Sequence, residues 1–311
     1  MSSSIAVSEK TISTSPNPSR RRLIINADDF GFNREITDGI VEAHVNGVVT
    51  STTLMINMPA AEYAVERAKD CPGMSVGLHV NLTAGRPVSE PEEVPSLVAE
   101  NGMFHDHATF FSRANRCAFA SSQLELEIRR QLQKIHDLGI SPTHVDSHHH
   151  AASCIQPFFI QLRLLKEFGI RKMRTHRGWY HSDSLTANRI GNLLKTFKTN
   201  LRRGPYRVYY ELQHQLCYLQ GIRTPTERFG FKKVVSDKDM DFAIDCLPTY
   251  LKAMPTGINE LCCHPGYLSN DPLDEPEFRT VRPRELDFFT NPKLGKALDE
   301  ANVELISYSD F

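Results

Sequence analysis

Short apolar runs alternate with helix-period segments along most of this chain, and this alternation constrains the fold more than any other feature. Residues 23–27 form the first run and predict a buried strand. A helix is expected next, because Asn33 can cap a segment whose apolar residues recur at helical spacing until Gly47. Strands that alternate with helices predict a parallel sheet, either open or closed into a barrel.

The same alternation continues to the C-terminus. Further strands are expected at residues 48–56, 75–82, 143–147, 170–175, 258–263 and 303–308, and further helices at 59–69, 122–135, 156–168, 238–252 and 292–301. Ser122 and Glu125 fit a capping box for one of these helices. Residues 84–120 predict a long loop, and the basic segment 180–235 contains two helix-period stretches, 193–201 and 209–219.

The length of 311 residues fits two ordinary domains or one α/β barrel with extensions. Residues 1–22 are rich in Ser, Thr and Pro and predict a disordered tail. An organelle transit peptide is the minor alternative for this basic, acid-poor tail. Since no apolar stretch approaches the roughly 18 residues of a membrane span, we expect a cytoplasmic protein that does not act in a membrane.

Charge and cysteine usage exclude several other classes. The chain has 36 Lys and Arg against 37 Asp and Glu, so no global field favours nucleic acid or anionic lipid as a partner. Seven cysteines without CxxC spacing argue against a disulfide framework or a thiolate zinc site, and buried thiols are expected. Histidine is the unusual residue: there are 13, and three are consecutive at His148–His150.

Polar residues collect where the predicted strands end. Asp28 and Asp29 follow the first strand, and His79 and His264 lie near the ends of two others. Parallel α/β proteins gather their catalytic groups at this edge of the sheet. If Gly31 lets the chain bend, one acid could bind a metal while the other accepts a proton from water. The alternative is that one of the two acids merely caps the next helix.

The segment Thr143–His150 is the densest cluster of imidazole and carboxylate groups in the chain and favours a metal site, although a histidine run can also be a solvated loop. His79 alone fits a hydrogen-bonded strand residue as well. His144 and Asp146 with the later His264 also imitate the metal triad of non-haem iron oxygenases. Those enzymes are usually all-β, so the alternation of strands and helices disfavours this second enzyme class.

Five motifs occur in order along the chain: Asn26–Gly31 (NADDFG), Ser51–Thr53 (STT), Gly77–Thr83 (GLHVNLT), Pro142–His150 (PTHVDSHHH) and Cys263–Gly266 (CHPG). Together they resemble the YdjC family of carbohydrate deacetylases, which is similar to chitooligosaccharide deacetylase. The resemblance implies a single distorted (β/α) TIM-like barrel with loop insertions over residues 23–311, distantly related to polysaccharide deacetylases.

The same resemblance implies a site and a reaction. Asp29, His79 and His148 would hold one divalent metal ion, Asp28 would act as general base and His264 as general acid. Metal-activated water would then remove acetyl groups from an N-acetylated sugar or oligosaccharide, the expected partner. The resemblance implies Mg²⁺, whereas two imidazoles suit Zn²⁺, Mn²⁺, Co²⁺ or Ni²⁺ better than a hard, oxygen-seeking ion.

Several questions stay open at the level of the sequence. Many relatives continue the histidine cluster as His-His-His-Val-His, and here Ala152 stands in place of the last histidine. The late Arg282, Arg284 and Glu285 fit either the site or a surface salt bridge in a loop. A non-catalytic protein that keeps the metal for sugar binding or as a scaffold is the alternative to an enzyme, and a homodimer is a possible assembly.

Overall fold

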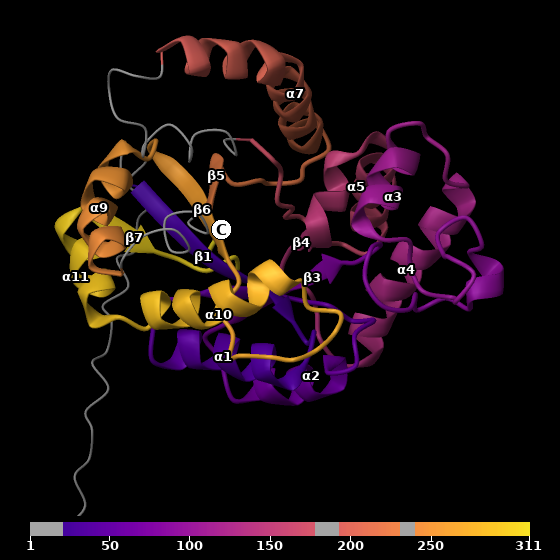
Figure 1. The fold of residues 1–311 in the computed structure, drawn as a ribbon, viewed down its shortest axis with the longest axis horizontal. Coiled ribbons are helices and arrows are strands. Elements are labelled where there is room, and N and C mark those ends of the chain that lie inside the picture. Colours follow the sequence, from indigo (N-terminus) through magenta and orange to yellow (C-terminus); the bar gives the residue numbers. More distant parts are fainter. Residues whose placement is uncertain (1–20, 178–192, 231–239) are drawn as a thin grey trace, which may run out of the picture.

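A parallel sheet forms the centre of the molecule in the computed structural model, which describes residues 21–177, 193–230 and 240–311 (Figure 1). Within those residues, the strands are β1 (Arg21–Phe30), β2 (Ser51–Leu54), β3 (Ser75–Val80), β4 (Val145–Ser147), β5 (Glu227–Gly230), β6 (Gly257–Cys263) and β7 (Val303–Leu305). They pair in the order β4-β3-β2-β1-β6-β5, and β7 pairs with Arg21–Leu23 at the start of β1. The predicted alternation of strands and helices is therefore confirmed.

Helices connect these strands. The α-helices are α1 (Arg34–Val45), α2 (Ala61–Lys69), α3 (His107–Ala114), α4 (Ser121–Asp137), α5 (Ile155–Glu167), α7 (Leu193–Leu219), α9 (Met240–Ala253), α10 (Pro276–Phe289) and α11 (Pro292–Glu300), and the 3₁₀ helices are η1 (Pro91–Glu93) and η2 (His148–Ser153). Figure 1 shows them around the strands: α9 with α11, α1 with α2 and α10, and α4 with α5. None of the described helices is long and apolar enough to cross a membrane.

Strand β1 lies inside the sheet between β2 and β6, and its residues 23–30 are therefore buried without interruption. In the register, Asn26 lies opposite Ser51 of β2 on one side and Cys262 of β6 on the other. The carboxyl ends of β2 and β6 therefore meet the end of β1. The acid pair that ends β1 lies at this meeting point, as expected for a parallel α/β protein.

Isolated bridges extend the pairing into a distorted barrel. Val145 of β4 bridges to Met173, and the neighbouring Lys172 bridges to Arg223. The chain then enters β5, which returns the pairing to β6 and β1. The expected strand at residues 170–175 consists only of these bridges. The distorted barrel predicted from the sequence is nevertheless confirmed.

Several local expectations change. Strand β1 begins at Arg21, two residues before the expected start of the barrel domain, while residues 1–20 of the expected tail lie outside the described residues. The supposed loop 84–120 contains α3 and η1. The two helical stretches expected near residues 193–219 form one helix, α7. Asn33 does cap α1, since its side chain accepts a hydrogen bond from the Ile36 amide.

Candidate functional site

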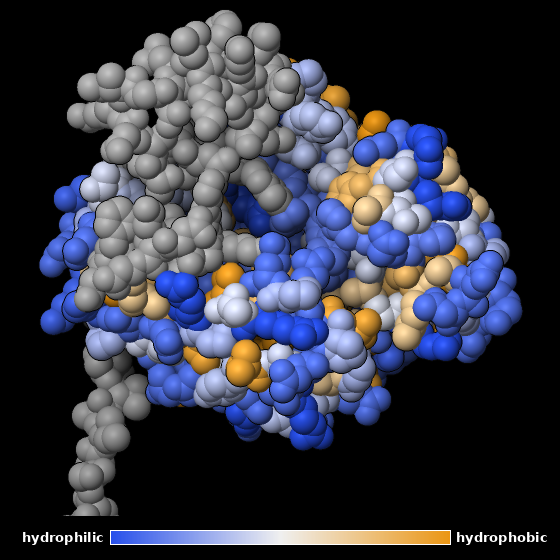
Figure 2. Space-filling view, in the orientation of Figure 1, coloured by the Kyte–Doolittle hydropathy of each residue, from blue (hydrophilic) through white to orange (hydrophobic). Residues whose placement is uncertain are grey.

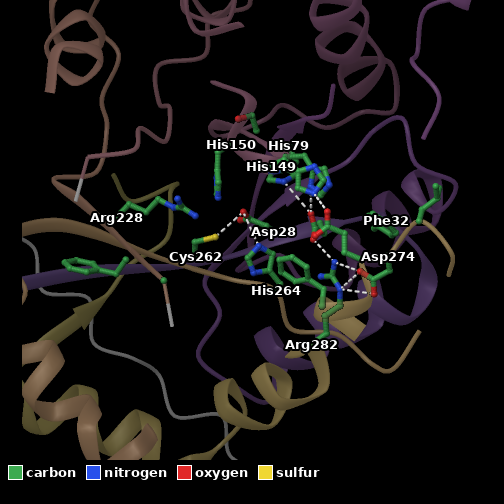
Figure 3. A pocket seen from close by; sticks show the side chains of 18 residues that line it. Asp28, Phe32, His79, His149, His150, Arg228, Cys262, His264, Asp274 and Arg282 are labelled. Atoms are coloured by element: carbon green, nitrogen blue, oxygen red, sulfur yellow. Dashed lines mark hydrogen bonds and ion pairs between the residues drawn. The ribbon is translucent and has the colours of Figure 1, made fainter. Parts of the chain in front are cut away.

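The end of β1 bends so that both acids face one cavity. Asp29 has a φ of 71°, in the left-handed region that residues other than glycine seldom adopt. Two residues later Gly31 has a φ of 83°, and a Cβ atom there would lie 2.7 Å from the Leu54 side chain. The bend therefore depends on Gly31, as the sequence predicted, and it lets Asp28 and Asp29 both line the cavity (Figure 3).

The three expected metal ligands converge. Asp29 from β1, His79 from β3 and His148 from η2 each offer one ligand atom, and these atoms lie within 4.8 Å of one another. Asp29 Oδ1 is 3.0 Å from His148 Nδ1 and 3.5 Å from His79 Nε2. One carboxylate and two imidazoles fit a divalent transition metal and leave positions for water and substrate.

A second carboxylate orients His79. Asp146 Oδ1 lies 2.6 Å from His79 Nδ1, and the Thr53 hydroxyl donates to the other oxygen of Asp146. This contact directs His79 Nε2 toward Asp29. A carboxylate on the other ring nitrogen is the usual support of a metal-binding histidine. Burial lowers the pKa of His79, but Asp146 and the Asp28–Asp29 pair outweigh burial and hold that pKa above its ordinary value. The sequence signal for Asp146 was its place in the histidine cluster.

Asp28 lies in a dense set of hydrogen bonds. The Arg174 guanidinium donates to both of its oxygens at 2.7 Å, and Asn26 donates to Oδ1. The Cys262 thiol donates to Oδ2 across 3.1 Å. Burial raises the pKa of Asp28, but Arg174 outweighs burial and holds that pKa well below its usual range. Asp28 therefore stays ionised. Sequence reasoning missed Arg174 and Cys262, although both lie at predicted strand ends.

Asp29 is fixed from the other side by Arg282. Arg282 Nη2 donates to Asp29 Oδ2 at 2.8 Å and also contacts Asp274. Burial raises the pKa of Asp29, but Arg282 and His148 outweigh burial and keep that pKa well below its usual value. Arg282 lies in helix α10 and is buried, so the expectations of a loop and of a surface salt bridge are wrong for this residue.

His264 follows β6 and faces Asp28 across the cavity. Its Nε2 lies 4.0 Å from Asp28 Oδ2, and its Nδ1 lies 3.9 Å from Glu285. Glu285 also accepts a hydrogen bond from the His264 backbone amide. Helix α10 therefore buries Glu285 against the turn that carries His264, whereas Arg284 beside it is exposed.

These groups surround a cavity of about 300 Å³. Figure 2 shows a hydrophilic hollow near the middle of the face that is turned to the viewer. His149 and His150 also line it, with φ values of 48° and 60°. Two consecutive left-handed residues of this kind are typical of functional sites. His149 contacts Thr83 and Glu275, and its burial, together with His148, lowers its pKa to about 2. The cavity has the size of a small-molecule site.

The oxygenase triad is not formed. His144 Nε2 lies 3.1 Å from Asn26 Oδ1, and its Nδ1 lies 2.9 Å from the Thr143 hydroxyl. Its ring stacks on Tyr308 with the ring centroids 3.5 Å apart. Among the described residues His144 belongs to no group that could hold a metal, so this interpretation of His144, Asp146 and His264 is wrong.

Two comparisons of sequence place the chain among known proteins. A family model described as YdjC-like protein matches residues 22–300. A carbohydrate deacetylase of Vibrio vulnificus (strain YJ016) is 44% identical over 289 residues, which cover 93% of this chain and 96% of that protein. A carbohydrate deacetylase of Brevibacillus brevis is 42% identical over 291 residues, which cover 93% of this chain and 99% of the relative.

A solved structure also resembles this chain over nearly its whole length. A candidate cellobiose-phosphate cleavage protein from Enterococcus faecalis V583 superposes with a TM-score of 0.73 and 26% identity. The match covers 94% of this chain and 99% of that one. The two proteins therefore share one fold over nearly their whole lengths.

Proposed function

Because the chain belongs to the YdjC-like protein family, we propose that it is a metal-dependent carbohydrate deacetylase acting on N-acetylated sugars or oligosaccharides. One observation carries the proposal: Asp28 and His264 face each other beside the converged group Asp29, His79 and His148. A site with a fixed carboxylate, an imidazole and a metal-binding trio has the parts that amide hydrolysis needs.

Asp29, His79 and His148 would hold the divalent ion. The donor set fits, because Asp146 fixes the orientation of His79 and Arg282 fixes that of Asp29. When bound there, such an ion supplies a water molecule of lowered pKa and polarises the acetyl carbonyl group. Family resemblance favours Mg²⁺, and the two imidazoles favour Zn²⁺, Mn²⁺, Co²⁺ or Ni²⁺.

Asp28 would act as the general base. Its carboxylate is held ionised by Arg174, so it is ready to accept a proton at neutral pH. A carboxylate of such low basicity takes a proton only from an acidified water molecule. The two bonds to Arg174 also fix the carboxylate in position, which favours proton transfer in one geometry.

His264 would act as the general acid. Water attacks the carbonyl carbon, the carbon–nitrogen bond breaks, and the leaving nitrogen takes a proton from His264. The products are acetate and a free amino sugar. Glu285 beside the His264 ring and its backbone amide would keep this histidine in place during the reaction.

Acetate release from N-acetylglucosamine oligomers in the presence of added Mg²⁺, Mn²⁺, Co²⁺, Ni²⁺ or Zn²⁺ tests the proposal. We expect Asp28→Asn to abolish release while the one ion held by Asp29, His79 and His148 stays bound, as measured by elemental analysis. Asp38→Asn is the matched control, because Asp38 lies outside the cavity and pairs with Arg67 at the surface. Metal bound without release from any acetylated sugar would support the non-catalytic alternative instead.

A further inference from the structure

A second group of metal-binding side chains lies beside the trio Asp29, His79 and His148. We infer that Asp28, Cys262 and His264 form a second cation site, which takes a thiophilic divalent ion such as Zn²⁺ and blocks the reaction when filled. The binding step stands on the geometry alone. The blocking step rests on the proposed function, because it requires Asp28 and His264 to be the base and the acid.

The distances suit a small cation. Asp28 Oδ2 lies 3.1 Å from Cys262 Sγ and 4.0 Å from His264 Nε2, and the three ligand atoms fall within 4.8 Å of one another. A tetrahedral zinc ion separates its ligand atoms by roughly 3.4–3.6 Å. A small rotation of His264, the most exposed of the three, would complete the geometry.

The fold fixes Asp28 and Cys262 on neighbouring strands and leaves both open to the cavity. Cys262 and Asp28 come from paired strands, since β6 pairs with β1 up to Cys263 opposite Ala27. Figure 3 shows the Cys262 sulfur directed at Asp28, with His264 on the adjoining wall. All three residues line the same cavity, so a cation that enters it meets all three ligands.

The buried charges around the two acids decide what a second ion needs. Among the described residues around the two acids, six buried carboxyl groups face three buried guanidinium groups. The carboxyl groups are those of Asp28, Asp29, Asp146, Glu260, Asp274 and Glu285, and the guanidinium groups are those of Arg174, Arg228 and Arg282. Burial raises the pKa of Glu260, and with this carboxyl group protonated one divalent ion balances the other five carboxylates and the three guanidinium groups. A softer second ion would therefore depend on the Cys262 thiolate, which supplies both a negative charge and a sulfur ligand.

Binding would exchange a proton for the metal. The Cys262 thiol now donates its proton to Asp28, and the ion would take the place of this proton between Sγ and Oδ2 while the proton leaves to the solvent. Asp28 Oδ1 would keep its bond to Arg174 Nη2, and Oδ2, which accepts from Arg174 Nη1, would use its other lone pair for the ion. The lone pairs that Asp28 and His264 need for proton transfer would then be engaged, and hydrolysis would stop.

Titration of the full-length, chelator-treated chain with Co²⁺ tests binding without any assay of activity. We expect two ions per chain and, with the second ion, a near-ultraviolet thiolate-to-Co²⁺ charge-transfer band. Cys262→Ser should bind one ion and lose the band, and Cys262→Ala serves if the serine variant does not fold. Cys117→Ser is the matched control, because Cys117 is exposed and lies outside the cavity, and it should keep the band.

Inhibition by excess Zn²⁺ tests the blocking step. With each variant normalised to its own activity at low zinc, Cys262→Ser should need about tenfold more Zn²⁺ for half inhibition. One ion per chain and no band, or equal zinc sensitivity in Cys262→Ser, would overturn the site even if the protein deacetylates sugars. A band without hydrolysis of any acetylated sugar would instead count against the proposed function alone.

Discussion

Arg174 donates two parallel hydrogen bonds to Asp28, from Nη1 to Oδ2 and from Nη2 to Oδ1, both 2.7 Å long. The same guanidinium contacts Asp146, which supports His79, and Glu260, which accepts a bond from the Tyr308 hydroxyl. A single buried cation thus connects the proposed base with the support of a proposed metal ligand. The planar fork of arginine makes this connection possible, since an ammonium group cannot bind a carboxylate in the same two-point manner.

Replacing Arg174 by lysine should keep the positive charge beside Asp28 but remove the two-point hydrogen bonding that fixes the carboxylate. We expect Arg174→Lys to lower kcat by about 100-fold with a smaller change in KM, because the base loses its fixed position. Arg174→Met should also lower the free energy of unfolding by about 3–5 kcal/mol, since it strands buried carboxylates. Steady-state kinetics and urea unfolding measure both effects. Activity of Arg174→Lys within twofold of the parent would contradict a positioning role.

Asp146→Asn should weaken metal binding. In the parent protein the Asp146 carboxylate lies 2.6 Å from His79 Nδ1 and accepts its hydrogen bond. An asparagine amide oxygen accepts this hydrogen bond more weakly, so His79 becomes a poorer metal ligand. We expect the dissociation constant for Zn²⁺ to rise about 10- to 100-fold in a competition titration with a chromophoric chelator. Thr52→Ser is the control, because the Thr52 hydroxyl bonds the Ala27 carbonyl instead. Unchanged affinity in Asp146→Asn would remove Asp146 from the support of the metal site.

His144 makes the stability of the protein depend on pH. Burial, and after it the positive charge of Arg174, hold the pKa of His144 well below its ordinary value of 6.5. Below pH 6.5 the unfolded chain binds a proton that folded His144 does not, so stability present above that pH is lost as the pH falls. His144→Gln should flatten the fall in unfolding free energy between pH 6.5 and pH 5 by about 1.4 kcal/mol per unit. Parallel pH profiles for the two proteins would refute this.

The strand ends alone predicted the convergence of the candidate site. Asp28, His79, His148 and His264 each stood near the carboxyl end of a predicted strand, and parallel strands bring these ends to one edge. The partners that hold these residues could not be predicted in the same way. Arg282 acts on Asp29 from 253 positions away, and nothing in its local pattern indicates that this face of α10 is buried.

A local rule failed at the start of α4, where the cap position lies two residues before the expected one. Ser122 and Glu125 fit a capping box, but α4 begins at Ser121 and its cap position is Ala120 without a side-chain bond. Glu125 therefore lies inside the helix, where it pairs with Arg129 and Arg163. One pair lies within α4 and the other reaches α5, so Glu125 binds side chains where the sequence suggested that it caps the helix.

Gly39 provides a prediction about the turn that carries His264. A Cβ atom on Gly39 in α1 would lie 2.5 Å from Gly266 Cα and 2.8 Å from the Tyr267 nitrogen, both backbone atoms. We expect Gly39→Ala to displace this turn, to lower the free energy of unfolding by about 1–3 kcal/mol and to reduce kcat. Gly295→Ala is the matched control in a helix: no neighbour lies within 4 Å of its Cβ position, so it should raise stability by about 0.5–1 kcal/mol. Urea unfolding of both variants decides the matter, and a change of the same sign in both would show that the contact between α1 and the turn does not govern stability here.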